Sequence, residues 1–266
     1  MLKQRVLTAL LLAAALLTVL FMLPEDVGVI LFGILMLIGA WEWSALAGLR
    51  EPVARAAYTF ALALLIGFLA WWVPTGDMPQ PLLWLQLGLW IGGGLLLTRF
   101  PVPIPGILSA PAGLAVLALA WLALSFILKT DALGPAWLLF IFLLVACADV
   151  GAYFAGRTLG RVKLAPRISP GKTWEGLVGG LVAVALACLV AAWWFGVPSA
   201  PLVFLGLAAA GLSVVGDLSV SMLKRNRGLK DSGSIFPGHG GVLDRVDSLL
   251  AALPVLVMGL KWLVVP

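Results

Sequence analysis

Acidic and basic side chains gather near the end of the chain, in types that could bind a metal ion and phosphate groups. Asp217 and Ser221 are four residues apart and share one face if this stretch is helical. Asp244 and Asp247 follow a glycine-rich stretch, residues 238–241, where backbone N–H groups can approach an anionic ligand closely. The basic residues of this segment are Lys224, Arg225, Lys230 and Arg245. Carboxylates from two helices beside such cations suit a divalent ion that bridges phosphates, and magnesium prefers carboxylate oxygen.

A second polar cluster lies upstream, between residues 146 and 176. Asp149 stands in an apolar stretch, with Tyr153 one helical turn further along the same face. A carboxylate in hydrocarbon is costly, so Asp149 should face a bundle interior, a watery cavity or a cation; packing against a loop arginine is the alternative. The basic residues that follow are Arg157, Arg161, Lys163, Arg167 and Lys172. Such loops also serve as topology signals or contact anionic lipid headgroups. Thr173 is a candidate N-cap for the next helix.

The elements that carry these residues are strongly apolar. Hydrophobic residues make up 62% of the 266 positions and charged residues only 11%, whereas soluble domains carry about 25% charge. Runs of roughly 20 apolar residues, enough to cross a bilayer core of about 30 Å, recur along the chain. The sequence therefore predicts an all-α polytopic membrane protein with about nine transmembrane helices. The expected helices are 6–23, 27–49, 56–75, 81–98, 108–128, 134–156, 174–196, 201–223 and 248–265.

The basic residues predict the orientation of these helices. All but two of the 17 lysines and arginines, Lys129 and Lys261, fall on one side of the membrane when the N-terminus is placed inside. The positive-inside rule then predicts a cytoplasmic N-terminus and a C-terminus outside. The same distribution explains the net charge of +5 by topology, so we expect no nucleic-acid partner.

The two long inner loops, residues 157–173 and 224–247, hold most of the chemistry and are both predicted to be cytoplasmic. We therefore expect residues 134–266 to form the catalytic part. Residues 1–133 would form a scaffold, a dimerisation surface or a lipid cavity. Glu42 is the polar exception there, between two tryptophans, and either a pairing with a cytoplasmic arginine or the lining of a cavity would explain it.

Two further patterns are less specific. Gly176 and Gly180 have the GxxxG spacing, which favours close helix packing over ligand binding. His239 is the only histidine of the chain. Without a second histidine or a nearby cysteine, a zinc site is not expected.

The segment 221–247, "SMLKRNRGLKDSGSIFPGHGGVLDRVD", resembles the signature of the phosphatidate cytidylyltransferases, also called CDP-diacylglycerol synthases. The upstream stretches "ADVGAYFAGR" and "ISPGKTWEG" are similar to other blocks of that family, with Gly171 where many members carry lysine. The specific resemblance covers approximately residues 146–248. The helices before it match only in being hydrophobic.

The resemblance implies an enzyme that transfers the cytidylyl group of CTP to phosphatidic acid, forming CDP-diacylglycerol and pyrophosphate for phospholipid biosynthesis. It also implies a multi-pass protein of a bacterial-type inner membrane, acting as a homodimer with its active site facing the cytoplasm. A magnesium ion would be bound by Asp217 and Asp244, and a monovalent cation is a candidate for a second ion. The expected catalytic residues are Asp217, Asp244, Lys224, Arg225, Lys230 and Arg245. The expected substrate-binding residues are Asp149, Arg157, Ser169, Lys172, Ser221, Asp231, His239, Gly240, Gly241 and Asp247.

Two other functions remain open at this point. A CTP-dependent polyprenol or lipid kinase would transfer the γ-phosphate of CTP to a lipid alcohol and release CDP. A cation-coupled transporter also places acidic residues inside membrane helices, although it often shows inverted repeats and a site near the midplane. Here the charge lies at one face, which favours the enzyme.

Overall fold

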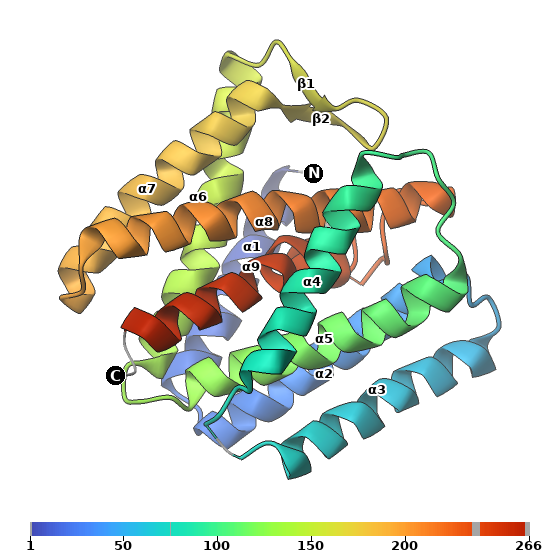
Figure 1. Cartoon of the computed structure of the whole chain (residues 1–266), viewed down its shortest axis with the longest axis horizontal. Coiled ribbons are helices and arrows are strands. Elements are labelled where there is room, and N and C mark those ends of the chain that lie inside the picture. The colour runs from blue at the N-terminus through green and yellow to red at the C-terminus, as the bar shows by residue number, and fades with distance from the viewer. Residues whose placement is uncertain (1, 75, 236–239, 264–266) are drawn as a thin grey trace. The chain divides into compact units, whose positions relative to one another are not determined.

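The computed structural model describes residues 2–74, 76–235 and 240–263, and it is almost entirely helical over these residues (Figure 1). The elements in chain order are α1 (Leu2–Phe21), α2 (Glu25–Leu46), α3 (Pro52–Trp72), α4 (Gln80–Leu97), α5 (Gly106–Leu128), α6 (Gly134–Thr158), β1 (Lys163–Ala165), β2 (Ser169–Thr173), α7 (Trp174–Phe195), α8 (Ser199–Asn226) and α9 (Leu243–Leu263). Within this part of the chain, eight of the nine helices, α2 to α9, are long and apolar enough to cross a membrane. The predicted all-α polytopic architecture is confirmed. The orientation of its termini stays a prediction.

Three features near the polar segments differ from what the sequence predicted. α8 continues three residues beyond the predicted end, to Asn226, and α9 starts at Leu243 rather than at residue 248. Hydropathy alone ends a helix where charge begins, but the charged residues at both positions continue the helical turn. The loop 157–173 contains an antiparallel hairpin, in which Lys163 pairs with Thr173 and Ala165 pairs with Ser169.

The chain forms two compact units, which are described separately below. Unit 1 comprises residues 1–82, 102–139 and 223–247. Unit 2 comprises residues 83–101, 140–222 and 248–266.

The framework of unit 1 is the packing of α2, α3 and α5 (Figure 1). Gly113 of α5 lies directly against the indole ring of Trp43, where any Cβ would overlap the ring. The indole nitrogen of Trp43 donates a hydrogen bond of 2.9 Å to the carbonyl oxygen of Ser109. From α3, the Tyr58 hydroxyl donates to the carbonyl oxygen of Ala110 at 2.8 Å. Since hydrocarbon offers no hydrogen-bond partners, such polar contacts between helices hold α2 and α3 in register on α5.

Unit 1 also contains the end of α8, which closes in a glycine turn. Gly228 has a φ of 70°, and the N–H groups of Gly228 and Leu229 donate to the carbonyls of Arg225 and Lys224 at 3.0 and 2.9 Å. This is a Schellman motif, which needs a left-handed residue just past the helix. The neighbouring Arg227 donates to the carbonyls of Leu46 and Ala47 at 2.9 and 3.1 Å. The segment after α8 is thereby attached to the end of α2.

In unit 2, small residues bring α6 and α7 into close contact. A Cβ on Gly179 would overlap the Cβ of Ala155, and a Cβ on Gly180 would lie 2.8 Å from the Ala148 carbonyl oxygen. Gly176 similarly faces the backbone of Gly156. The predicted packing role of Gly176 and Gly180 is confirmed. Close backbone approach of this kind is a common way for membrane helices to associate.

A proline in α9 determines how α4 packs in unit 2. Pro254 has no N–H, so the carbonyl of Leu250, four residues earlier, loses its donor within the helix. The indole of Trp90 donates to this carbonyl at 3.0 Å, and the amide of Gln86 donates at 3.3 Å. Both donors come from α4, so a polar group freed by proline is satisfied by a neighbouring membrane helix.

Candidate active site

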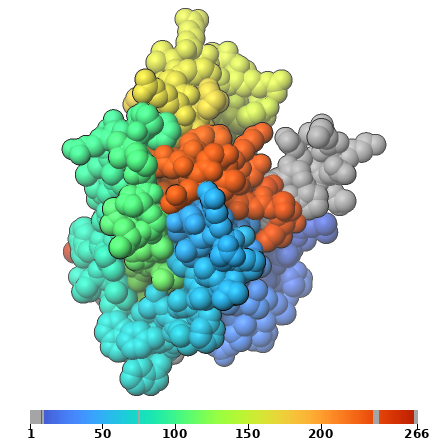
Figure 2. Space-filling model, turned by 90° about the vertical axis from the view of Figure 1, so that its right-hand side faces the viewer, coloured from blue at the N-terminus to red at the C-terminus, as the bar shows by residue number. Residues whose placement is uncertain are grey.

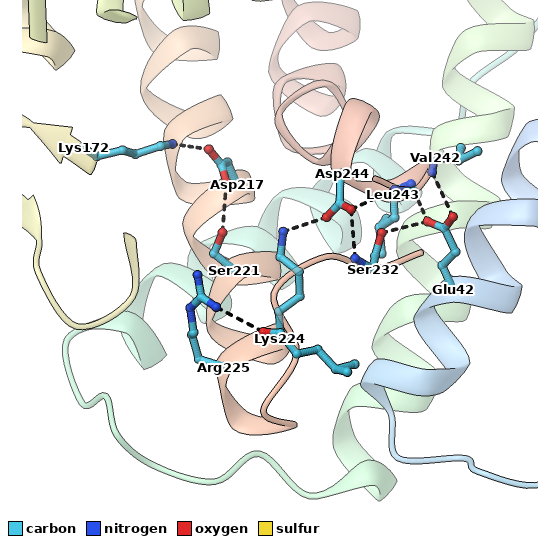
Figure 3. A network of polar contacts seen from close by, with 12 residues as sticks. Glu42, Lys172, Asp217, Ser221, Lys224, Arg225, Ser232, Val242, Leu243 and Asp244 are labelled. Carbon is cyan, nitrogen blue, oxygen red and sulfur yellow. Dashed lines mark hydrogen bonds and ion pairs between the residues drawn. The ribbon is translucent and has the colours of Figure 1, made fainter. Parts of the chain in front are cut away.

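Asp244, in the first turn of α9, is the centre of a buried polar network in unit 1 (Figure 3). Its Oδ1 atom accepts a hydrogen bond of 2.7 Å from the Lys224 ammonium, and the two side chains are only 6% and 9% exposed. Its Oδ2 atom accepts from the backbone N–H groups of Ser232 at 2.9 Å and Gly241 at 3.0 Å. All three donors come from residues 224–241 of the same unit. The structure therefore brings Lys224, Gly241 and Asp244 together, and the roles expected for them stay predictions.

Glu42 of α2 reaches the same segment, although sequence reasoning left its role open. It is 2% exposed and accepts hydrogen bonds from the Ser232 hydroxyl at 2.8 Å and from the N–H groups of Val242 and Leu243 at 2.9 and 2.8 Å. Among the described residues its hydrogen bonds all come from this segment, so they tie α2 to the segment and not to an arginine. The signal in the sequence was the cost of an acidic residue between two tryptophans of an apolar helix.

The remaining predicted site residues of unit 1 differ in how exposed they are. Exposed side chains belong to Arg225, Lys230, Asp231 and Arg245. The guanidinium of Arg225 donates to the Leu229 carbonyl at 3.2 Å, and Asp247 is buried, with 6% exposure. Gly240 has a φ of 83°, and a Cβ there would lie 2.7 Å from the Asp244 carboxylate. His239 lies outside the described residues.

Unit 2 contains a second lysine–aspartate pair. The Lys172 ammonium on β2 forms an ion pair with Oδ2 of Asp217 on α8, and these side chains are 28% and 26% exposed. The Ser221 hydroxyl, one turn further along α8, donates to Oδ1 of Asp217 at 3.1 Å. The predicted pairing of Asp217 and Ser221 on one helix face is confirmed. Lys172 reaches Asp217 because the hairpin returns the chain to the start of α7 (Figure 3).

A pocket with a volume of 440 Å³ opens beside Lys172 within unit 2. Small residues of α6 and α7 form much of its wall, and Ser213 and Ser248 contribute hydroxyl groups. The predicted substrate-binding residues that line it are Asp149, Arg157, Ser169 and Lys172. Arg157 also donates to the Tyr153 hydroxyl at 2.7 Å. The volume lies within the range of small-molecule sites, about 300–1,000 Å³.

The hairpin next to this pocket is exposed and basic, and it lies within the yellow part of Figure 2. Its exposed cationic residues are Arg161, Lys163 and Arg167. Thr173 accepts a hydrogen bond of 3.1 Å from the N–H of Gly176, which confirms it as the N-cap of α7. Glu175 accepts from the N–H of Val162 at 3.2 Å and so holds the hairpin against the helix.

Comparison with known proteins identifies the family. The sequence model of the cytidylyltransferase family matches residues 3–263. The chain belongs to this family. A phosphatidate cytidylyltransferase of Pseudomonas aeruginosa is 40% identical over 273 residues, which cover 98% of this chain and 97% of the relative. Proteins of the same name from Haemophilus influenzae and Brucella suis are 37% and 36% identical and cover 96% and 97% of this chain. The matched regions cover 96% and 92% of these two relatives, respectively.

For a member of this family the two lysine–aspartate pairs are the natural candidates for phosphate chemistry. Each pair holds an ammonium group against a carboxylate, so each supplies both a cation that can bind a phosphate and an anion that can bind a metal ion. Among the described residues, no three His, Cys, Asp or Glu side chains gather in a group that could hold a metal. One or two carboxylates together with substrate phosphates is the usual way in which proteins bind magnesium.

Proposed function

We propose that this protein transfers the cytidylyl group of CTP to phosphatidic acid, forming CDP-diacylglycerol and pyrophosphate for phospholipid biosynthesis. The observation that carries the proposal is the family match over residues 3–263. It is supported by 40% identity with a protein named phosphatidate cytidylyltransferase over nearly the whole of both chains. The polar networks around Asp217 and Asp244 support it as well, because both offer cations and carboxylates for a phosphate-rich substrate.

The reaction makes modest demands on acid–base chemistry. The lipid phosphate is anionic at neutral pH, so one of its oxygens can attack the α-phosphorus of CTP without a strong general base. The new phosphorus–oxygen bond forms as the bond to the β-phosphate oxygen breaks, and the electron pair leaves with pyrophosphate. The task of the protein is therefore to position two anionic substrates and to compensate their charge.

Lys172 and Lys224 are well placed for that task. Each ammonium group is bound to an aspartate, so an arriving phosphate can take the lysine while the carboxylate takes a new cationic partner. Exchange of partners keeps the local charge balanced throughout binding. The exposed Arg225, Lys230 and Arg245 would contact the outer phosphates of CTP.

Carboxylate oxygens are the ligands that magnesium prefers, so Asp217 and Asp244 fit as the residues that would hold it. A bound magnesium ion would neutralise the charge that develops on the phosphate oxygens. The protein supplies the orientation: Ser221 fixes one oxygen of Asp217, and two backbone N–H groups fix one oxygen of Asp244. A monovalent cation is proposed as a second ion, which turnover in potassium and in choline buffers would test.

The pocket beside Lys172 is proposed to bind a phosphate-bearing part of one substrate, with Arg157, Ser169 and Lys172 as its polar contacts. Asp149 would orient these cations. Replacement of Arg157 by Gln identifies which substrate it is, because the KM of either CTP or phosphatidic acid should rise while the other changes little. If the KM for CTP and the KM for phosphatidic acid are both the same in the variant as in the wild type, Arg157 is excluded from the site.

The decisive experiment is product analysis with purified protein in detergent, supplied with CTP, phosphatidic acid and magnesium. We expect equimolar CDP-diacylglycerol and pyrophosphate. Release of CDP with phosphorylation of a lipid alcohol would show a lipid kinase instead. Ion flux into vesicles without CTP would show a transporter. No lipid product with any divalent ion would refute the proposal.

The cellular setting is proposed to be a bacterial-type inner membrane, with the active site facing the cytoplasm and two chains per enzyme. The bacterial relatives and the basic loops support this setting. Arg167, on the exposed hairpin, can be replaced by cysteine and treated with a thiol reagent that does not cross the membrane. In spheroplasts this cysteine should be labelled only after permeabilisation, when the reagent reaches the cytoplasmic side. Labelling in intact spheroplasts would reverse the topology, and a monomeric mass in detergent would contradict the dimer.

A further inference from the structure

Glu42 lies in α2, yet among the described residues its carboxylate accepts hydrogen bonds only from residues about 200 positions later (Figure 3). Oε1 accepts from the N–H of Val242, and Oε2 accepts from the N–H of Leu243 and from the Ser232 hydroxyl. Leu243 is the first residue of α9, and N–H groups at a helix start have no partner within the helix. Glu42 therefore satisfies two backbone donors at the start of α9.

Two glycines of the segment make this contact possible. A Cβ on Gly233 or on Gly241 would overlap the Glu42 carboxylate. The glycine-rich stretch was expected to bring the backbone close to a ligand, and here it brings the backbone close to Glu42. The carboxylate is thus packed between the two sides of the loop, next to Ser232 on one side and Val242 on the other.

The same loop residues hold Asp244. Ser232 donates through its hydroxyl to Glu42 and through its N–H to Oδ2 of Asp244. Gly241 donates its N–H to the same oxygen, immediately before the residues bound to Glu42. Fixing Ser232 and residues 241–243 on α2 therefore fixes the two donors that orient Asp244. The other oxygen of Asp244 is left directed at Lys224.

We propose that Glu42 is a positioning residue, which holds Ser232 and residues 241–243 so that the Asp244 carboxylate keeps the orientation needed for catalysis. The inference rests on the proposed function, in which Asp244 binds the magnesium ion of the reaction. Glu42 touches neither substrate in this role. Its charge is compensated by backbone N–H groups and a hydroxyl, and its two oxygens are both required as acceptors.

Glu42→Gln tests this requirement with almost no change of shape. A glutamine amide offers one acceptor oxygen and one NH₂ group, so in either orientation the NH₂ faces the N–H of Val242 or of Leu243. One backbone donor is then left unpaired and the loop shifts. Loss of outer contacts that orient metal ligands typically costs about 10- to 100-fold in metal affinity or activity. We therefore expect the magnesium concentration for half-maximal turnover to rise by about 10- to 100-fold.

Ser44→Ala is the matched control. Ser44 is a buried polar residue two positions along α2, and its hydroxyl donates to the Trp41 carbonyl at 2.6 Å, away from the segment. This variant should keep the magnesium dependence of the wild type. A second readout needs no metal: deuterium exchange without magnesium should be faster in Glu42→Gln at residues 228–235 and 240–247, and unchanged in Ser44→Ala.

Asp244→Asn, measured in parallel, separates the two hypotheses. Normal turnover in Asp244→Asn would refute the role of Asp244 in the proposed function. If Asp244→Asn loses turnover while Glu42→Gln keeps the wild-type magnesium dependence and deuterium exchange, the role of Glu42 is overturned. If Glu42→Gln does not fold, Ser232→Ala decides, since it removes one of the three donors and keeps the N–H to Asp244. A magnesium requirement raised a few-fold supports the proposal, and an unchanged one overturns it.

Discussion

The contact between Lys224 and Asp244 allows a folding effect to be separated from a catalytic effect. The ammonium and carboxylate are 2.7 Å apart, and their side chains are 9% and 6% exposed. Removing one partner of such a buried pair leaves the other charge without compensation, which costs about 3–5 kcal/mol of unfolding free energy. Asp244→Asn and Lys224→Met should each show a loss of this size.

The double variant should behave differently in the two assays. With both charges gone, no buried charge is left uncompensated, so the double variant should be more stable than either single variant. The coupling free energy between the two substitutions should therefore exceed the loss in either single variant, about 3–5 kcal/mol. Turnover should stay at least about 100-fold below wild type, because the groups that contact phosphate and metal are both missing. Unfolding in detergent and formation of CDP-diacylglycerol measure the two quantities. Recovery of activity together with stability would refute the catalytic role of the pair.

Three further predictions concern unit 2. Asp217→Asn should lower turnover by about 100- to 1,000-fold but the unfolding free energy by no more than about 1 kcal/mol, since its ion pair is partly exposed; near-normal turnover would exclude Asp217 from the metal site. Gly179→Leu should destabilise by about 1–3 kcal/mol through overpacking between α6 and α7. By contrast, Gly211→Ala within α8, which meets open space, should keep the stability or raise it by up to about 1 kcal/mol in the same unfolding assay. Trp90→Phe should cost about 1 kcal/mol by removing a donor to the Leu250 carbonyl, and an unchanged unfolding curve would contradict that account.

The membrane helices could be predicted from the sequence because each is a long apolar run, and hydrocarbon permits few other structures. The start of α9 could not be predicted from hydropathy, since Asp244, Arg245 and Asp247 interrupt the apolar pattern. An acidic residue in the first turn is nevertheless favourable there, because it faces the positive end of the helix dipole. Its position after a glycine-rich stretch was the available signal. The hairpin gave a weaker signal, since "SPGKT" contains proline and glycine.

The contacts of the candidate site could likewise be predicted from the sequence only in part. Asp217 and Ser221 could be paired from their spacing alone, because residues four apart on a helix are neighbours. The partner of Glu42 could not be predicted, because its contacts are separated by 190 to 201 positions. Two of its three donors are backbone N–H groups, which every residue except proline carries. A pattern of side-chain types holds no information about such a contact.

The three carboxylates differ in what compensates their charge, and this difference matches the roles proposed for them. Asp217 and Asp244 are each bound by a lysine ammonium. Because the lysine side chain is flexible, its ammonium can move to a phosphate and leave the carboxylate free to bind another cation. Glu42 is bound by the N–H groups of Val242 and of Leu243, the first residue of α9, which cannot leave without a change of the backbone at the start of that helix. A carboxylate with exchangeable partners can take part in a reaction whose charges change. A carboxylate with fixed partners is suited to hold the segment in place while the charges of the reacting groups change.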